Sequence, residues 1–266
     1  MWWLALAVAH AECGMPWPVW SVGDGAVPDD PTVLLFWAGM DFGPTEVHAV
    51  DEAGVRREVT VTALPSGPNV AAWSVHVDTD GPGRVSLEAR WPEGTGVAPV
   101  TAELRVRAGA VEVPPVQITA EGATAESWTC SHQATRDLSL RAPGALGFVV
   151  RAAADGVPLD GPEVQEVVLP PHPDLLWGSR DGRGQRLELG HADCLGDTLV
   201  FAGSLTVQIA AIGAGGQRGP WTAPRVLEVP VEADGMEIDI DLGPLSPDLS
   251  PPRRGLFRRL RAGSGR

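Results

Sequence analysis

The sequence contains no lysine and no tyrosine, and its 20 basic residues are all arginines. The 34 acidic residues outnumber them and give a formal net charge of −14 at pH 7. A strongly acidic chain repels the phosphate backbone of nucleic acids, so this composition argues against binding of DNA or RNA. The missing lysine also excludes a standard phosphate-binding loop, because that motif requires the residue.

Signatures of hydrolytic enzymes are missing as well. The sequence has neither a G-x-S-x-G nucleophile motif nor an H-E-x-x-H metal motif. No pair of carboxylates can be singled out for glycoside cleavage among the 34 acids. We therefore expect no catalytic residues and no cofactor, and we predict that the protein is not an enzyme.

Long hydrophobic runs are lacking, since none reaches the roughly 18 residues that cross a bilayer. The N-terminal MWWLALAVAHAEC has a short apolar run followed by Ala9-His10-Ala11, the A-x-A pattern of a secretory cleavage site. We predict a signal peptide over residues 1–11 and an extracytoplasmic location, in the periplasm, at the cell surface or in the medium. Lipidation at Cys13 is the less favoured alternative, because Glu12 and not a small residue precedes it.

Glycine and proline are abundant, at 32 and 25 residues, and they separate short apolar runs throughout the chain. Many of these runs alternate apolar and polar residues, which is the pattern of half-buried strands, whereas helical periodicity is weak. We predict an all-β protein with strands in the segments 31–38, 59–61, 73–77, 85–91, 102–108, 138–140, 148–153, 167–169, 187–189, 205–211 and 223–231.

The spacing of strands and turns predicts two antiparallel β-sandwiches in tandem. The first sandwich is expected over residues 12–112 and the second over 113–243, with Pro114 and Pro115 as a hinge between them. Residues 244–266 read as a proline-rich spacer and a basic tail.

Two stretches resemble known families. SVGDGAVPDDPTVLLF, residues 21–36, resembles the opening of bacterial Ig-like domains, where a turn with proline and glycine leads into the first core strand. LTVQIAAIGAGGQRGPW, from Leu205 to Trp221, with a further strand after it, resembles the end of a fibronectin type III domain. Leu205 stands where that family usually has a tyrosine whose hydrogen bond fixes a corner of the sandwich. The resemblance implies a tandem Ig-like and fibronectin type III-like protein of the cell envelope.

Three cysteines are present, and two of them lie next to histidines. Cys130-x-His132 and His191-x-x-Cys194 could ligate a metal, but they lack the C-x-x-C regularity of zinc sites. A disulfide between Cys130 and Cys194 explains these cysteines with fewer assumptions in an oxidising compartment, and it would contribute roughly 4 kcal/mol by closing the loop. We predict the disulfide and no metal site. The alternative is a metal-binding protein or hydrolase that uses all four residues, and Cys13 stays unassigned.

Basic residues gather at the C-terminus, in RRGLFRRLRAGSGR. Near an anionic surface each of them would contribute about 1 kcal/mol. The sequence leaves open whether this tail makes peripheral contact with such a surface or stays solvated. The candidate contact residues are Arg253, Arg254, Arg258, Arg259 and Arg261.

Tryptophans and acidic turns offer weaker signals. Trp37, Trp73 and Trp91 are in phase with core strands, so we expect them to be buried. Trp17, Trp20 and Trp177 are the only candidates for an exposed aromatic patch, and packing against the ends of the sandwiches is the favoured interpretation for them too. Residues 78–81, DTDG, resemble a fragment of a calcium loop but lack its later ligands, which favours a solvated turn.

The function that these patterns favour is a non-enzymatic secreted or envelope protein that acts as a binding or structural spacer module. Binding sites on such folds usually lie in end loops or on an edge strand, and the fold does not name the ligand. The partner, an unidentified protein or an envelope glycan, is left open.

Overall fold

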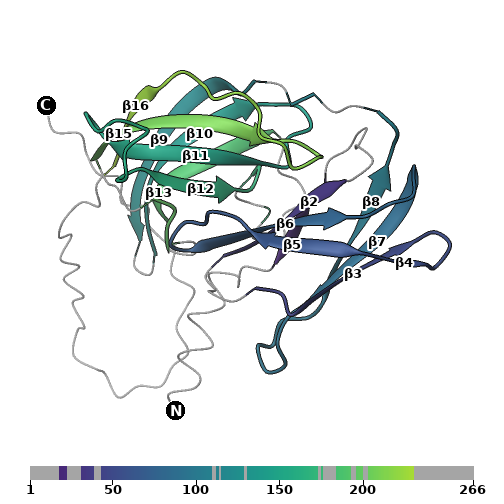
Figure 1. Ribbon diagram of the computed structural model, residues 1–266. Helices are drawn as coiled ribbons and strands as arrows, with labels where there is room; N and C mark the ends of the chain where they lie inside the picture. Colours follow the sequence, from purple (N-terminus) through teal and green to yellow (C-terminus); the bar gives the residue numbers. More distant parts are fainter. Residues whose placement is uncertain are drawn as a thin grey trace, which may run out of the picture.

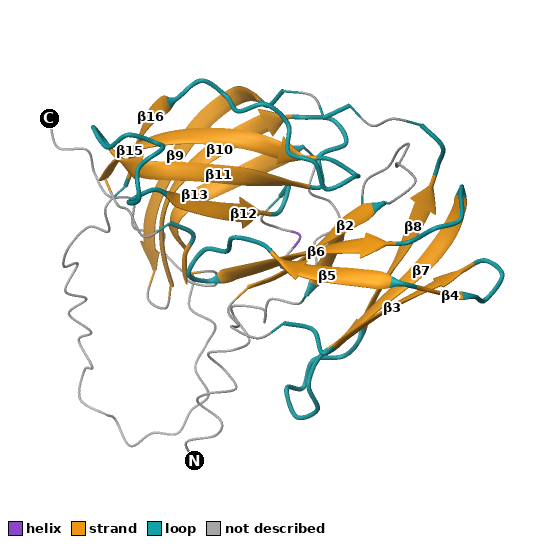
Figure 2. Ribbon diagram, viewed as in Figure 1, coloured by secondary structure: helices purple, strands orange, loops and turns teal. Residues whose placement is uncertain are grey.

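The computed structural model describes residues 18–22, 31–38, 43–109, 112–113, 115–128, 131–172, 175, 184–192, 196–199 and 203–230. Its described part is built from antiparallel strands, which confirms the predicted all-β class (Figures 1 and 2). The strands are β1 (Val19–Ser21), β2 (Thr32–Ala38), β3 (Glu46–Asp51), β4 (Arg56–Arg57), β5 (Val59–Ala63), β6 (Val70–Val77), β7 (Gly83–Arg90), β8 (Val100–Val106), β9 (Gln117–Trp128), β10 (Ser131–Arg141), β11 (Gly147–Ala154), β12 (Gln165–Leu169), β13 (Gln185–Ala192), β14 (Gly196–Asp197), β15 (Gly203–Ile212) and β16 (Arg225–Val229).

The strands form two sandwiches, each made of two four-stranded sheets. In the first, sheet β1-β2-β6-β5 faces sheet β4-β3-β7-β8, which corresponds to the A-B-E-D and C′-C-F-G order of Ig-like domains. In the second, sheet β14-β13-β10-β9 faces sheet β12-β11-β15-β16. This is the A-B-E and C′-C-F-G order of fibronectin type III domains with the short β14 added. The predicted tandem of sandwiches is confirmed.

The first sandwich has a core rich in tryptophan. Trp37, Trp73 and Trp91 are 2%, 8% and 6% exposed, as predicted from their phase in the strands. Trp37 and Trp91 meet edge to face, with ring centroids 5.2 Å apart and an interplanar angle of 80°. Trp20 also lies in this core, and its Nε1 donates to the Val100 carbonyl at 3.1 Å, so it does not belong to an exposed patch.

Every residue of β2 is buried, because each face of this strand packs in a different core. Val33, Leu35 and Trp37 point into the first sandwich. Leu34, Phe36 and Ala38 point the other way and join the core of the second sandwich. An uninterrupted apolar run is typical of a strand covered on both faces. Figure 1 shows β2, β5 and β6 lying between the second sandwich and sheet β4-β3-β7-β8.

The contact between the sandwiches is tight as well as apolar. A Cβ at Gly147 would lie only 2.9 Å from Leu34 Cδ1 and 3.1 Å from Phe36 Cζ, so a glycine is required there. Polar contacts accompany this packing, since the Ser21 hydroxyl donates to the Leu146 carbonyl at 2.5 Å and the Val168 amide donates to the Pro65 carbonyl at 2.8 Å.

The turn after β15 reaches into the first sandwich. It follows the segment predicted as a strand and glycine-rich turn, and regular pairing resumes only at Arg225. The turn residue Ala214 is 5% exposed and belongs to the first core, and its carbonyl accepts from the Thr32 amide at 2.7 Å. Gly216 has a φ of 72° and packs against Thr32, where a side chain would be strained. Leu205, in the place of the family's tyrosine, is buried in the second core.

Apolar residues on both sides of Pro114 pack against the second core. Val113 packs against the second core and Val116 is 7% exposed within it, so residues on both sides of Pro114 are anchored. The hinge at Pro114 and Pro115 stays a prediction, with Val113 half-buried and Val116 buried on either side of it.

Several predictions fall outside the described residues. These are the signal peptide, Trp17, Trp177, the three cysteines and the basic tail from 244 to 266. Within the described residues, no helix has the length and hydropathy to cross a membrane.

Candidate binding face

The first sandwich has one sheet face that the second sandwich does not cover. This is the outer side of β4-β3-β7-β8, which we call the open face. Strand alternation produces it, because Ala49, Leu87 and Leu104 are buried inward while their neighbours point outward. The open face carries Glu46, His48, Val50, Arg56, Arg84, Ser86, Glu88, Arg90, Thr101, Glu103 and Arg105.

A groove of about 710 Å³ crosses the open face. Strand pairing brings its walls together, since His48 lies opposite Glu88, and Glu88 lies opposite Thr101 on the next strand. Val50 is 37% exposed beside it, one of the few large apolar side chains that the described residues expose. The groove therefore offers an apolar patch within a polar rim, and such a combination suits a protein or glycan ligand.

His48 is fixed by hydrogen bonds at both of its ring nitrogens. Arg56 Nη2 donates to Nδ1 at 2.6 Å, so this nitrogen must act as the acceptor. Nε2 lies 3.0 Å from Glu46 Oε2 and donates to it. Because both nitrogens are engaged, the ring is arranged for hydrogen bonding and not for binding a metal.

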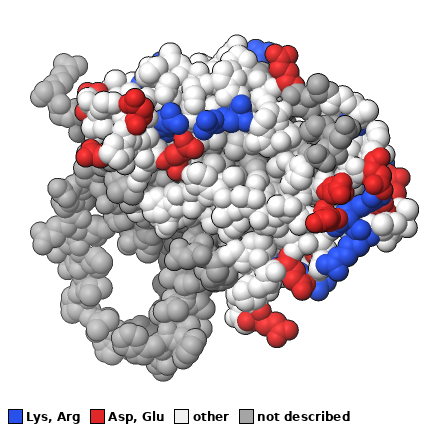
Figure 3. Space-filling model, viewed as in Figure 1, with Lys and Arg blue, Asp and Glu red and all other residues white. Residues whose placement is uncertain are grey.

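The charges of the open face are balanced although the whole chain is acidic. Glu103 lies 3.4 Å from Arg84 and 3.3 Å from Arg105, and Arg90 lies 2.5 Å from Glu88. Figure 3 shows acidic and basic side chains interleaved over this side of the first sandwich. Exposed pairs of this kind contribute between about 0 and 1 kcal/mol each, so their importance lies in the pattern they present to a partner.

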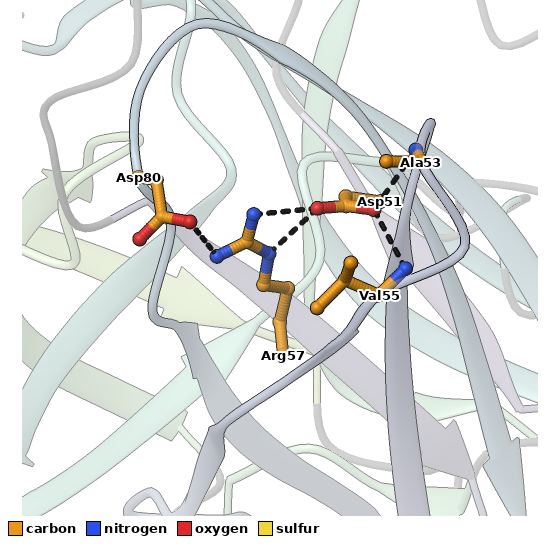
Figure 4. A network of polar contacts seen from close by, with 5 residues as sticks. All are labelled: Asp51, Ala53, Val55, Arg57 and Asp80. Atoms are coloured by element: carbon orange, nitrogen blue, oxygen red, sulfur yellow. Dashed lines mark hydrogen bonds and ion pairs between the residues drawn. The ribbon is translucent and has the colours of Figure 1, made fainter.

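An ionic network lies at the end of the same sheet, where β3 turns into β4, and is drawn in Figure 4. Asp51 Oδ1 accepts from the amides of Ala53 and Val55 at 2.9 and 2.8 Å, which shapes the turn after β3. Asp51 Oδ2 accepts from Arg57 Nε and Nη2 at 2.9 and 2.5 Å, and Arg57 Nη1 also donates to Asp80. The Val55 amide and then the Arg57 guanidinium lower the pKa of Asp51, and Asp80 and Asp51 raise the pKa of Arg57.

The same network accounts for the acidic turn at residues 78–81. Asp80 is paired with Arg57 and its side chain is 83% exposed. Three or more side chains able to hold a metal ion do not gather anywhere in the described part of the chain. This arrangement agrees with the solvated turn that the sequence favoured for this segment.

The second sandwich carries a cation–π cluster that the sequence did not indicate. The guanidinium carbons of Arg151 and Arg218 lie 4.5 and 4.8 Å from the ring centroid of Trp221. Glu166 joins both arginines, at 3.2 and 3.7 Å. The cluster fixes the chain between β15 and β16 against β11 and β12.

The histidines of the predicted cysteine and histidine group lie on adjacent strands. His191 of β13 is opposite Ala134 of β10, and His132 precedes Ala134 by two residues, so both backbone positions belong to one face of the sheet. Cys130 and Cys194 are outside the described residues. The disulfide and its metal-binding alternative therefore both stay predictions.

Sequence reasoning missed the open face mainly because it missed β3. In EVHAVD the outward Val50 is as apolar as the inward Val47, which blurs the alternation. The signal that identifies the strand is the pairing of β3 with β7, and this pairing joins residues about 40 positions apart, such as Val47 and Ala89. A local pattern does not contain it.

No protein-family model matches the sequence, and no curated protein matches it. Among solved structures, the FN1–FN3 domains of chicken CNTN1 match at 12% identity over 81% of this chain and 65% of that one, with a TM-score of 0.28. The Ig1–Ig3 ectodomain of mouse nectin-like molecule 4 matches at 14% identity over 83% and 66% of the two chains, with a TM-score of 0.25. A pullulanase from an Anoxybacillus species matches at 10% identity, and the chain spans 24% of its length, with a TM-score of 0.23.

Strand order decides the fold. The chain is a tandem of two antiparallel sandwiches whose strand orders are those of Ig-like and fibronectin type III-like folds. The chain spans about two thirds of the two multidomain structures it matches and a quarter of the pullulanase, so their activities are not transferred to it.

Proposed function

We propose that this protein is a non-enzymatic secreted or envelope module, in which two sandwiches act as one rigid unit that presents the open face to a partner. The observation that supports the proposal is that the second sandwich packs on only one of the two sheets of the first sandwich. Sheet β1-β2-β6-β5 is covered on its outer side by the second sandwich, whereas β4-β3-β7-β8 is left open.

Rigidity follows from the nature of the contact between the sandwiches. Neighbouring domains usually move relative to one another unless their interface is large and apolar. Here Leu34, Phe36 and Val70 of the first sandwich share a core with Phe148 and Leu169 of the second. A spacer with this interface holds its ends at a fixed separation and angle.

The open face supports the binding part of the proposal. Its exposed Val50 lies next to hydrogen-bonding groups and alternating charges, so a partner would be selected by a charge pattern and a small apolar contact. An envelope protein or an envelope glycan fits this chemistry, and neither requires a catalytic group.

The experiment is a pull-down from native envelope material with matched variants. Val50→Asp places a charge on the open face, and Val226→Asp places the same charge on the second sandwich, where Val226 is 54% exposed. We expect Val50→Asp to lose the captured partner and Val226→Asp to keep it. Equal capture by both variants would refute the assignment to the open face.

A second candidate function is a metal-binding protein or hydrolase that uses Cys130, His132, His191 and Cys194. The observation in its favour is the shared sheet face of the two histidine positions. Elemental analysis of the purified protein decides it, because one zinc per chain would support the metal site and replace the predicted disulfide.

The basic tail supports a further part of the envelope proposal, which is peripheral contact with an anionic surface. The contact residues would be Arg253, Arg254, Arg258, Arg259 and Arg261, whose charge is opposite in sign to that of the whole chain.

A further inference from the structure

The edge strand β9 is unusual for its length. It has 12 residues and lies at the edge of sheet β14-β13-β10-β9, where only β10 pairs with it among the described strands. The other strands at sheet edges have between 2 and 7 residues. A long edge leaves a row of backbone N–H and C=O groups without strand partners, and proteins normally shorten, charge or cover such an edge.

The side of β9 that faces the core is only partly covered. Ala123 lies opposite Arg136, and Arg136 lies opposite Leu189, which is fully buried in the second core. Ala125 lies opposite the buried Ala134 on the same side. Ala123 and Ala125 are nevertheless exposed. Their small side chains leave room at the rim of the core for apolar groups from another strand.

Strand β16 begins beside this edge and ends over β13. At the start of β16, Arg225 lies 2.6 Å from Glu121 of β9. At its end, Val229 and the Ala134 carbonyl both lie against Gly190, within 2.9 and 2.4 Å of where a Cβ would be. Ala134 is opposite Ala125. Along the strand direction the chain therefore runs from the level of Glu121 to the level of Ala125, and it leaves the sandwich over β13, two strands from the β9 edge.

The sequence that follows has the composition of a turn and a strand. Ala233-Asp234-Gly235 is a reversal signal, because Asp-Gly is one of the pairs preferred in tight turns. MEIDID then alternates apolar Met236, Ile238 and Ile240 with acidic residues. This segment lies outside the described residues.

We propose that Met236–Asp241 is the occupant of the β9 edge and adds to it as an antiparallel strand. A reversal after Val229 makes the segment antiparallel to β9, and the six residues between Val229 and Met236 span at most about 20 Å, enough to cross two strand spacings of about 5 Å to that edge. Its apolar residues then face Ala123 and Ala125 and cover the rim of the core. Its acidic residues, Glu237, Asp239 and Asp241, face the solvent. The new edge would be short and negatively charged, which opposes pairing with further chains. The proposal does not depend on the proposed function.

The test compares two truncated proteins by amide hydrogen exchange. Truncation after residue 243 keeps the segment and removes only the spacer and basic tail, whereas truncation after residue 230 removes both. We expect amides of β9 to exchange at least about 10-fold faster in the shorter protein, with no difference in β11. We also expect the shorter protein to self-associate at its uncovered edge. Equal exchange of β9 in the two proteins would overturn the proposal.

A full-length variant guards against misfolding of the truncated protein. Ile238→Asp with Ile240→Asp removes the apolar face, and Glu237→Gln with Asp239→Gln is the matched control that keeps it. Faster β9 exchange only in the first variant supports the proposal. Protection of β9 that rises with protein concentration in the full chain would identify a second copy as the occupant and overturn it.

Discussion

Asp51 uses both carboxylate oxygens, one for the turn after β3 and the other for Arg57. Backbone amides and a guanidinium favour the ionised form, which is why the pKa of this group is lowered. A lowered pKa stabilises the folded protein above the unfolded pKa of about 3.9, and this contribution is lost as the pH falls through the folded value.

Asp51→Asn tests that linkage, because an asparagine can still accept from Ala53 and Val55 but does not carry the charge that attracts Arg57. We expect the variant to unfold more easily than the wild type at pH 7, and the difference to shrink below about pH 4. Urea unfolding at a series of pH values measures this difference in the free energy of unfolding. A difference that stays constant between pH 7 and pH 3 would contradict the assignment.

Cys130 and Cys194 give a second prediction at the residue scale. Peptide mapping without reductant should find them linked, and reduction should lower the free energy of unfolding by about 2–5 kcal/mol. Cys13→Ser serves as the control and should change neither result. Free thiols together with bound zinc would contradict the disulfide and favour the metal-binding alternative.

At the scale of the element, successive residues of β2 pack in different cores. Phe36→Ala should cost about 3–5 kcal/mol and speed hydrogen exchange in β11 and β12, because Phe36 packs in the second core. Trp37→Ala should cost a similar amount but affect β3 and β7. Val61→Ala on the edge strand β5 is the control, since Val61 is 40% exposed. Identical exchange patterns for Phe36→Ala and Trp37→Ala would refute the assignment of these residues to two different cores.

The elements also show what sequence can and cannot predict here. Alternation in β6, β7 and β8 correctly predicted strands and the inward tryptophans, because side-chain period is a local property. The apolar run of β2 was recognised as a core strand, but its second partner was not. That partner includes Phe148 and Leu169, more than 100 positions away in the chain, and local patterns carry no information about such pairing.

The candidate site was predicted less well than the fold. No local sequence pattern singles out His48, and only the pairing of β3, β4 and β7 gives it Arg56 and Glu88 as neighbours. Which face of a sheet stays open depends on where the second sandwich docks. Gly147 is one requirement of that docking, because its missing side chain leaves room for Leu34 and Phe36.

At the scale of the whole molecule, a shared core predicts shared unfolding. Scanning calorimetry of the full chain should show one transition, because unfolding of either sandwich would expose apolar residues of the other, Leu34 and Phe36 in the first or Phe148 and Leu169 in the second. Val226→Asp, a surface change, should leave a single transition. Two resolved transitions in the wild type would show that the sandwiches are independent and would remove the basis of the rigid spacer.

The tail makes the other prediction at this scale. The full chain should sediment with vesicles that contain anionic lipid, and binding should weaken as salt screens the arginines. Removal of residues 253–266 should abolish it, with neutral vesicles as the control. Binding that survives this truncation would contradict surface contact through the tail.

The double role of β2 also affects how the protein is made. Synthesis delivers the first sandwich before the second, so Leu34, Phe36 and Ala38 have no cover until the residues from Leu146 onward have followed. During that interval a nascent chain exposes an apolar sheet face of the kind that chaperones recognise. The order of synthesis therefore makes the nascent chain more prone to aggregation than the complete, folded protein.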